Sequence, residues 1–512
     1  MPDSRVHADT DGDRLEPQER SQQRTETPLD EVFGDGFDRQ LIVVSNRQPY
    51  RHTVDDDETA VDCPVGGLTA GLDPVMQALG GTWVAWGDGD ADKQAVDDED
   101  CVSVPPEQEA YTLRRIWLSE EQVDNYYYGF ANQVLWPTCH GMLTNVRYEH
   151  RFWQHYRGAN EAFAAAVADQ VSDDDVVWFH DYHLALAPKL VSRTVSTSPT
   201  LAHFWHIPWP SPETFRSCPH GRSILTGLLH NDLLGFHVSR DRRNFLDCVD
   251  ATVPAATVDH ERGEVRYRGT TTTVEAIPMG VPVDEIESLV REQRRAGATT
   301  SFREAHDVPP DVTLAVGVDR LDYTKGIPER LDALERFWEQ RPEWRGDLTF
   351  VQKGSESRSQ IPAYRDLQRR VESRVETINE RFGTADWQPI IFTTDELPRA
   401  DLYGLYDDAD VALVSPLCDG LNLVAMEYVA AQLDDDGVLV LSDRAGAHDL
   451  LGQHALSIDP TATDDFASTI GRAVSMHPTE RAVRMHELRQ QVAEHDLSAW
   501  VNEFLLAIDE LA

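Results

Sequence analysis

Two basic residues stand on either side of a short turn in the stretch GVDRLDYTKGIPERL, residues 317–331. Arg320 follows an apolar run, and Lys325 precedes a helical pattern in which Pro328 is typical of a first turn. Free backbone N–H groups at a helix start attract anions, so the stretch predicts a site for a phosphate-type anion. The alternative is that the two cations only form ion pairs with nearby carboxylates, namely Asp319, Asp322 and Glu329.

Other polar residues also follow apolar runs, and ligands of parallel α/β sheets bind outside the carboxyl ends of the strands. In the first half of the chain these residues are Ser45, Asn46, Arg47, Gly66, Gly67, His180, Asp181 and His206. In the second half they are Asp319, Arg320, Arg358, Asp419 and Gly420. Cations at such positions in an acidic chain indicate anionic ligands, and phosphates fit them best.

Three further patterns are weak. Gly66 and Gly67 could bring backbone N–H groups close to a diphosphate, but an ordinary tight turn explains such a pair equally well. The DGD triplet at residues 88–90 resembles a metal-binding carboxylate pair, yet such triplets arise by chance in an Asp-rich chain. The histidines at 180, 183 and 206 do not have HExxH spacing, so we predict no metal site.

Short runs rich in Val, Ile and Leu alternate with helix-period segments along most of the chain, which is typical of buried parallel strands with crossover helices. The pattern predicts an α/β fold with two Rossmann-like, doubly wound domains facing a cleft, over residues 39–290 and 291–495. Residues 1–38 are acidic and poor in large apolar side chains, which predicts a disordered tail. Residues 496–512 predict a C-terminal helix that could cross back to the first domain.

The chain has 512 residues with 46 Lys+Arg, 89 Asp+Glu and a formal net charge of −43, which argues against nucleic acid and anionic membrane as partners. Acidic clusters recur along the whole chain, as expected of a surface adapted to the salt-rich cytoplasm of a halophile. The six cysteines lack CxxC spacing, and no signal-like start or long apolar run is present. We therefore expect a reduced, cytoplasmic protein without structural zinc.

Long motifs in a fixed order connect the chain to a known family. They are SNRQPY, GGLTAGL, YYYGFANQVLWPTCHG, FHDYHLALAP, HIPWPSPETFRSCP, LLGFH, GVDRLDYTKGIPERL, SPLCDGLNLVAMEYVAAQ and VLSDRAGA. Over roughly residues 40–510 the chain closely resembles the trehalose-6-phosphate synthases, retaining glucosyltransferases of the GT-B fold. The resemblance implies transfer of glucose from a nucleotide-diphosphate glucose, usually UDP-glucose, to glucose 6-phosphate, without a cofactor or metal.

The resemblance also implies roles for particular residues. The acceptor site would comprise Arg47, Tyr127, Trp136, Asp181 and Arg358, of which Arg47, Tyr127 and Arg358 hold the phosphate. The donor site would comprise Gly66, Gly67, His206, Arg320, Lys325, Leu397, Asp419, Leu423, Val424, Ala425, Met426 and Glu427. The catalytic set would be Asp181, His206, Arg320, Lys325 and Asp419. Cations fixed around the leaving diphosphate stabilise the charge that develops there, which agrees with these assignments.

Four positions depart from the family pattern: Ala85 replaces Gly, Tyr128 replaces Asn, Cys418 replaces Arg and Met426 replaces Lys. Because Cys418 and Met426 flank the nucleotide side, GDP- or ADP-glucose remain alternative donors. Glycerol 3-phosphate is an alternative acceptor, and a non-catalytic sugar-phosphate sensor is an alternative of another class. A phosphorylase would need a lysine carrying pyridoxal phosphate. A homo-oligomer is compatible with the sequence.

Overall fold

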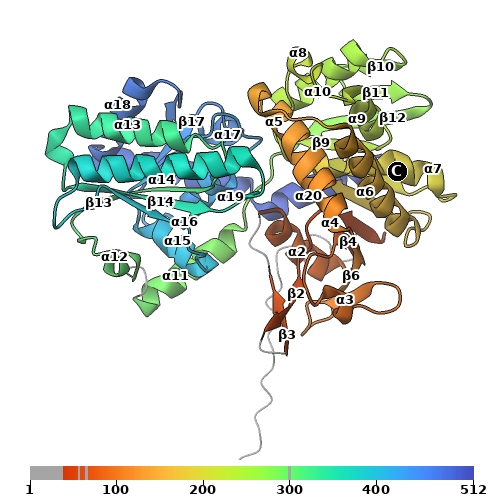
Figure 1. Cartoon of the computed structure of the whole chain (residues 1–512), viewed down its shortest axis with the longest axis horizontal. Coiled ribbons are helices and arrows are strands. Elements are labelled where there is room, and N and C mark those ends of the chain that lie inside the picture. Colours follow the sequence, from red (N-terminus) through yellow and green to blue (C-terminus); the bar gives the residue numbers. More distant parts are fainter. Residues whose placement is uncertain (1–38, 56–57, 64–66, 298–300, 512) are drawn as a thin grey trace, which may run out of the picture.

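Parallel strands form two separate sheets in the computed structural model, which describes residues 39–55, 58–63, 67–297 and 301–511. The two α/β units that contain these sheets lie side by side (Figure 1). The prediction of a disordered tail at residues 1–38 lies outside the described residues, and so does the predicted site residue Gly66.

The first sheet has ten strands in the order β10-β11-β12-β9-β8-β7-β1-β4-β6-β5. The strands are β1 (Leu41–Val44), β4 (Thr82–Trp86), β5 (Cys101–Val104), β6 (Tyr111–Ile116), β7 (Val176–His180), β8 (Thr200–Phe204), β9 (Leu233–Phe236), β10 (Ala256–Asp259), β11 (Glu264–Tyr267) and β12 (Thr270–Ala276). The pairings from β12 through β6 are parallel, and β5, β10 and β11 add antiparallel edges. Strands β1 and β7 are buried along their whole length, which their continuous apolar runs predict.

Helices cover both faces of this sheet. They are α2 (Gly67–Leu79), α3 (Asp92–Ala95), α4 (Glu120–Asn125), α5 (Trp136–Cys139), α6 (His150–Ala168), α7 (Ala187–Thr194), α8 (Pro212–Phe215), α9 (Gly221–Leu228) and α10 (Ser239–Thr252). A π-helical segment, η1 (Tyr126–Leu135), joins α4 to α5 and carries the YYYGFANQVL run. A small hairpin of β2 (Arg51–Asp55) and β3 (Glu58–Asp62) projects from the unit (Figure 1).

The second sheet has six strands, all parallel, in the order β15-β14-β13-β16-β17-β18. The strands are β13 (Thr313–Arg320), β14 (Leu348–Ser355), β15 (Ile390–Thr393), β16 (Val411–Val414), β17 (Val438–Ser442) and β18 (Leu456–Ile458). Its helices are α11 (Val283–Ala296), α12 (Ser301–Ala305), α13 (Ile327–Gln340), α14 (Pro362–Phe382), α15 (Arg399–Asp408), α16 (Leu423–Ala431), α17 (Ala447–Leu451), α18 (Thr463–Val474) and α19 (Pro478–Glu494). Two doubly wound, Rossmann-like units confirm the predicted fold class.

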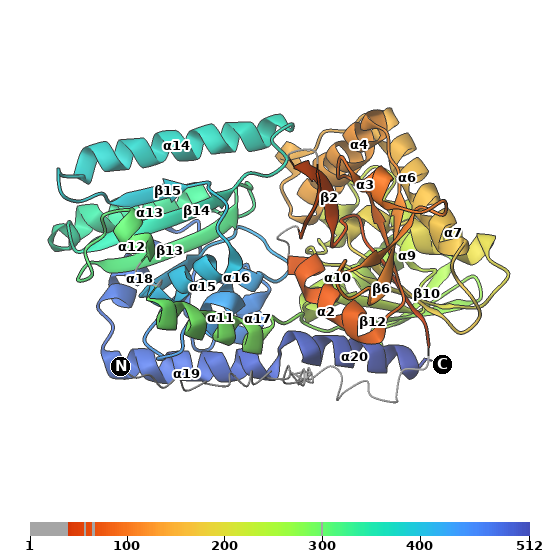
Figure 2. The same cartoon turned by 90° about the horizontal axis from the view of Figure 1, so that it is seen from below.

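The last helix, α20 (Leu497–Asp509), lies against the first sheet although it follows the second unit in sequence. The ring of Trp500 lies 5.3 Å from that of Trp178, and the ring of Phe504 stacks on Trp178 at 4.6 Å. Figure 2 shows α19 and α20 running end to end beneath the two units. The chain passes between the units twice, before α11 and before α20. These two segments are in contact, since Leu497 N donates to Val281 O at 3.1 Å. The domain limits at residues 290 and 495 remain predictions.

In the described parts of the chain, no helix combines the length and the apolar character needed to span a bilayer.

Candidate active site

A cavity of about 480 Å³ opens between the two units. The first unit contributes Arg47, Trp86 and Tyr127 to its lining, and the second contributes Arg320, Arg358 and Leu397. Residues that are far apart in sequence, and that were predicted to contact two different phosphate-bearing ligands, therefore face one space. Such a cleft between α/β units is a common ligand site.

Arg47 and Tyr127 meet on the first-unit side of the cavity. Arg47 follows β1 and is exposed, and its Nη2 donates to the Tyr127 hydroxyl at 3.2 Å. Tyr127 lies in η1, and its ring stacks on His183 with centroids 5.7 Å apart. Burial raises the pKa of Tyr127, but the charges of Arg47 and Arg358 outweigh burial and lower that pKa to about 8. The phenol therefore belongs to a strongly positive pocket.

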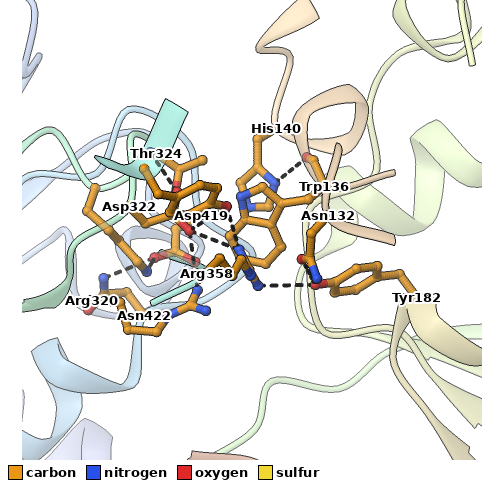
Figure 3. A network of polar contacts seen from close by, with 12 residues as sticks. Asn132, Trp136, His140, Tyr182, Arg320, Asp322, Thr324, Arg358, Asp419 and Asn422 are labelled. Atoms are coloured by element: carbon orange, nitrogen blue, oxygen red, sulfur yellow. Dashed lines mark hydrogen bonds and ion pairs between the residues drawn. The ribbon is translucent and has the colours of Figure 1, made fainter. Parts of the chain in front are cut away.

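Arg358 is buried in the loop after β14, where its φ of 50° is unusual for a residue other than glycine. Its Nη1 donates to Asp322 at 3.1 Å and to the Tyr364 hydroxyl at 2.7 Å, and its Nη2 donates to the Tyr182 hydroxyl at 3.2 Å. The guanidinium lies 4.1 Å from the centre of the Trp136 ring (Figure 3). Arg358 is therefore held by both units, since Tyr182 and Trp136 belong to the first.

Asp181 and His206 lie at the carboxyl ends of β7 and β8. Asp181 has a φ of 72°, and its carboxylate accepts a hydrogen bond from Tyr182 N at 2.9 Å. Burial raises the pKa of Asp181 to about 7. His206 Nε2 lies 3.1 Å from Nδ1 of His180, and burial lowers the pKa of both rings. Both histidines are therefore neutral at ordinary pH, so one ring must donate to the other.

The two cations of the opening stretch have different partners. Arg320 is the last residue of β13, and its Nη2 lies 3.7 Å from Asp322 Oδ2. Lys325 Nζ forms a short contact with the carboxylate of Asp419. The local ion pair that the sequence offered as an alternative to an anion site is therefore present between Arg320 and Asp322. The carboxylate of Asp319 instead accepts from the buried Arg330 at 2.7 Å.

The start of α13, which follows Lys325 in sequence, packs tightly against the backbone after β16. Gly326 precedes this helix with a φ of 64°, and a Cβ added there would lie 2.0 Å from Ser415 O. Only glycine fits this position without a shift of the backbone. The predicted helix start near Pro328 is confirmed, and it supplies free N–H groups near Lys325.

The loop predicted to hold the donor, here called the donor loop, runs from Asp419 into α16. Asn422, with a φ of 97°, caps this helix: its Oδ1 accepts from Ala425 N at 3.2 Å and its Nδ2 donates to Asp419 at 3.1 Å. The N–H of Ala425 is therefore already used within the protein. Across the cleft, a Cβ on Gly67 would lie 2.8 Å from Leu423 Cδ1, so α2 and the donor loop are in close contact.

The remaining predicted donor residues occupy different environments. Glu427 is half-buried on α16; burial raises its pKa to about 7, although the charge of Arg399 opposes this shift. Val424 is half-buried beside Leu423 at the start of the same helix, and Leu397 lines the cavity. The side chain of Met426 is fully buried in the hydrophobic core, so it faces away from solvent.

Several residues of the site were not singled out from the sequence. Trp86 lines the cavity, and Tyr182 and Tyr364 hold Arg358. Asp322 was considered only as an ion-pair partner, yet it contacts both Arg320 and Arg358. The sequence signal available at Trp86 is an aromatic residue at the end of an apolar run, and such a residue also fits an ordinary core position.

Among the residues that the structure describes, no group of three or more His, Cys, Asp or Glu side chains is arranged to hold a metal ion.

Two Rossmann-like units with a cation-lined cleft between them are the architecture of the GT-B glycosyltransferases. Residues 39–510 match the family model "Glycosyltransferase family 20". The chain belongs to glycosyltransferase family 20, and it is a glycosyltransferase.

Three similar proteins illustrate the relationship. The alpha,alpha-trehalose-phosphate synthase [UDP-forming] of Candida albicans is 33% identical over 445 residues, which cover 86% of this chain and 91% of the relative. The structure of the UDP-forming synthase of Burkholderia xenovorans in complex with glucose-6-phosphate has a TM-score of 0.81 and 31% identity, over 92% of this chain and 100% of that one. An E. coli structure described as trehalose-6-phosphate bound with UDP-2-fluoro glucose has a TM-score of 0.80 and 32% identity, over 92% and 98% of the two chains.

Proposed function

We propose that this chain transfers glucose from UDP-glucose to glucose 6-phosphate, giving α,α-trehalose 6-phosphate and UDP with retention of anomeric configuration. The observation that carries the proposal is a cleft lined by Arg47, Arg320 and Arg358. Arg47 and Arg358 suit one phosphate. Arg320 suits another, together with Lys325, which directly precedes the start of α13. The relatives described as UDP-forming, and the related structures with a UDP-sugar analogue and with glucose-6-phosphate, support this pair of substrates.

The acceptor half would hold glucose 6-phosphate by its phosphate. Arg47 and the Tyr127 hydroxyl can both donate to phosphate oxygens, and Arg358 can add its Nε, which has no hydrogen-bond partner among the described residues. Asp181, at the end of β7, would accept from a sugar hydroxyl. This arrangement favours an acceptor with both a sugar ring and a phosphate.

The donor half would stabilise the leaving group. Arg320, Lys325 and the start of α13 surround the predicted diphosphate position, and charge develops on that diphosphate as the anomeric bond breaks. Lys325 would exchange its contact with Asp419 for the diphosphate, which frees the Asp419 carboxylate to accept from a glucose hydroxyl. Glu427 would accept from the ribose hydroxyls.

Retention follows from attack on the face that the leaving group vacates. The bond from C1 to the diphosphate oxygen breaks, the bond from C1 to the acceptor oxygen forms, and the acceptor proton passes to an oxygen of the departing UDP. Water competes with glucose 6-phosphate as acceptor, so closure of the cleft between the units would favour transfer over hydrolysis.

The test is incubation of the folded protein in concentrated salt with UDP-, GDP- or ADP-glucose and with glucose 6-phosphate or glycerol 3-phosphate. Release of nucleotide diphosphate and the linkage of the product by NMR are measured. We expect the fastest transfer with UDP-glucose and glucose 6-phosphate. Faster transfer to glycerol 3-phosphate would assign another acceptor, and no product with any pair would support a non-catalytic sensor.

We further infer that the enzyme works in a salt-rich cytoplasm, where trehalose would serve as a compatible solute. The net charge of −43 supports this inference, because self-repulsion at that charge is relieved by screening. Thermal unfolding and activity measured from low to molar KCl test the salt requirement, and cell fractionation tests the location. Light scattering after size exclusion tests whether the chain forms a homo-oligomer.

A further inference from the structure

A single buried carboxylate lies between the cations proposed for the two substrates. The side chain of Asp322 has no exposed surface, and its Oδ2 is 3.1 Å from Nη1 of Arg358 and 3.7 Å from Nη2 of Arg320. Figure 3 shows the three side chains together at the junction of the two units. Asp322 therefore contacts one cation of the acceptor half and one of the donor half.

Both guanidiniums also lie near the ring of Trp136. That of Arg358 lies 4.1 Å and that of Arg320 lies 5.0 Å from the centre of the Trp136 ring. Two cations near one ring repel each other, and solvent screens part of this repulsion because the Arg320 side chain is 39% exposed, whereas Arg358 is buried. Burial raises the pKa of Asp322, but the charges of Arg320 and Arg358 lower it below its ordinary value, so the carboxylate stays ionised between them.

Asp322 is itself held rigidly. Its Oδ1 accepts from the backbone N and from the hydroxyl of Thr324, both at 3.1 Å. The Tyr364 hydroxyl donates to Oδ2 at 3.3 Å and accepts from Arg358 at 2.7 Å. With both oxygens held, the carboxylate is a fixed point, and Arg358 keeps one N–H, on Nε, without a partner among the described residues.

We propose that Asp322 is a positioning residue that holds Arg320 and Arg358 at a fixed separation and thereby aligns the donor diphosphate with the acceptor phosphate. The inference rests on the proposed function, because it assumes that the two arginines bind those two groups. Asp322 reduces the positive charge that each anion meets, so it weakens ground-state binding slightly. It favours turnover, because reacting groups must be held within about an ångström of their productive positions.

The test uses Asp322→Asn in the full chain. The substitution keeps the shape of the side chain and removes its negative charge. We expect kcat to fall about tenfold or more. The dissociation constants of UDP and of glucose 6-phosphate, measured separately by calorimetry, should stay within a few-fold of the wild-type values or become tighter. A merely structural defect would instead weaken binding of both ligands, and that result, or an unchanged kcat, would overturn the proposal.

Two further variants complete the design. Tyr364→Phe keeps every charge but removes the hydroxyl that joins Asp322 to Arg358, so we expect a smaller loss of kcat with unchanged binding; unchanged kcat here would also count against the proposal, even if Asp322→Asn does not fold. Asp408→Asn is the matched control, since it breaks a largely buried ion pair with Arg303 at 2.7 Å outside the cleft and should alter neither kcat nor binding. A wild type without activity on any substrate pair would contradict the proposed function, whereas an active wild type with a fully active Asp322→Asn variant would contradict only this inference.

Discussion

The ammonium group of Lys325 lies against the carboxylate of Asp419, joining the turn before α13 to the loop after β16. The charge of Lys325 keeps the pKa of Asp419 below its ordinary value although burial raises it. The residue proposed to hold the diphosphate is thus paired with the residue proposed to hold the transferred glucose. If these proposed roles hold, donor binding would replace this contact, in which each charge now neutralises the other.

Removal of a donor-side cation should damage turnover more than folding. In Lys325→Ala and Arg320→Ala we expect kcat to fall about 10²- to 10³-fold, because each side chain stabilises charge that develops on the leaving diphosphate. Steady-state kinetics with saturating donor measure the effect, and circular dichroism checks the fold. Near-normal turnover in both variants would show that the diphosphate binds elsewhere.

Arg47 should determine affinity for the phosphate of the acceptor. Because Arg47 is exposed and pairs only weakly with Tyr127 at 3.2 Å, Arg47→Ala should fold normally. We expect the KM for glucose 6-phosphate to rise about 10- to 100-fold, which corresponds to one lost charge-assisted hydrogen bond. Unphosphorylated glucose is the control acceptor, and its slow transfer should be unaffected. An equal loss with both acceptors would contradict a phosphate-specific role.

Tyr127 should limit acceptor binding at alkaline pH. Its pKa is lowered to about 8 in the ligand-free protein, since Arg47 and Arg358 outweigh burial. A bound phosphate dianion disfavours the phenolate, so binding favours the protonated phenol and weakens as pH rises through that pKa. We expect kcat/KM for glucose 6-phosphate to fall above about pH 8 in the wild type. In Tyr127→Phe the alkaline decline should disappear, and an unchanged pH profile would refute the assignment.

Glu427 should give donor binding the opposite pH dependence. Burial raises its pKa to about 7, so the carboxylate becomes protonated as pH falls below that value. A ribose hydroxyl donates best to an ionised carboxylate, and the KM for UDP-glucose should therefore rise at acidic pH. In Glu427→Gln the KM for UDP-glucose should be raised at every pH and should show no further rise at acidic pH. UDP calorimetry at two pH values measures the effect without turnover.

Much of the fold could be predicted from local patterns. Uninterrupted apolar runs such as residues 41–44 and 176–180 form buried parallel strands, because a strand covered on both faces needs apolar side chains at every position. Helix starts such as that of α13 also follow from local signals. The return of α20 to the first sheet was only an option in the sequence, since an apolar helix face does not specify which sheet will cover it.

Part of the candidate site could also be predicted from local patterns. Residue type and position after an apolar run placed Arg320, Asp181 and Asp419 at strand ends, because all parallel strands of a sheet end at one edge. Lys325 was placed by the predicted helix start that follows it. The pairing of Lys325 with Asp419 could not be foreseen, since 94 residues separate them and nearer carboxylates were available to the lysine. The buried environments that shift the pKa of Tyr127 and Glu427 also depend on packing between distant segments.

The sequence by itself therefore determined two doubly wound units, a set of strand-end cations and the family to which the chain belongs. The tertiary structure decided which charges neutralise one another. Asp322 meets Arg358 across 36 residues, and Arg358 meets Tyr182 across 176 residues and across the two units. Periodicity and capping act over a few residues of the chain, whereas the energy of an ion pair depends on distance and burial in space. Only the folded chain brings Arg320 and Arg358 to one shared carboxylate.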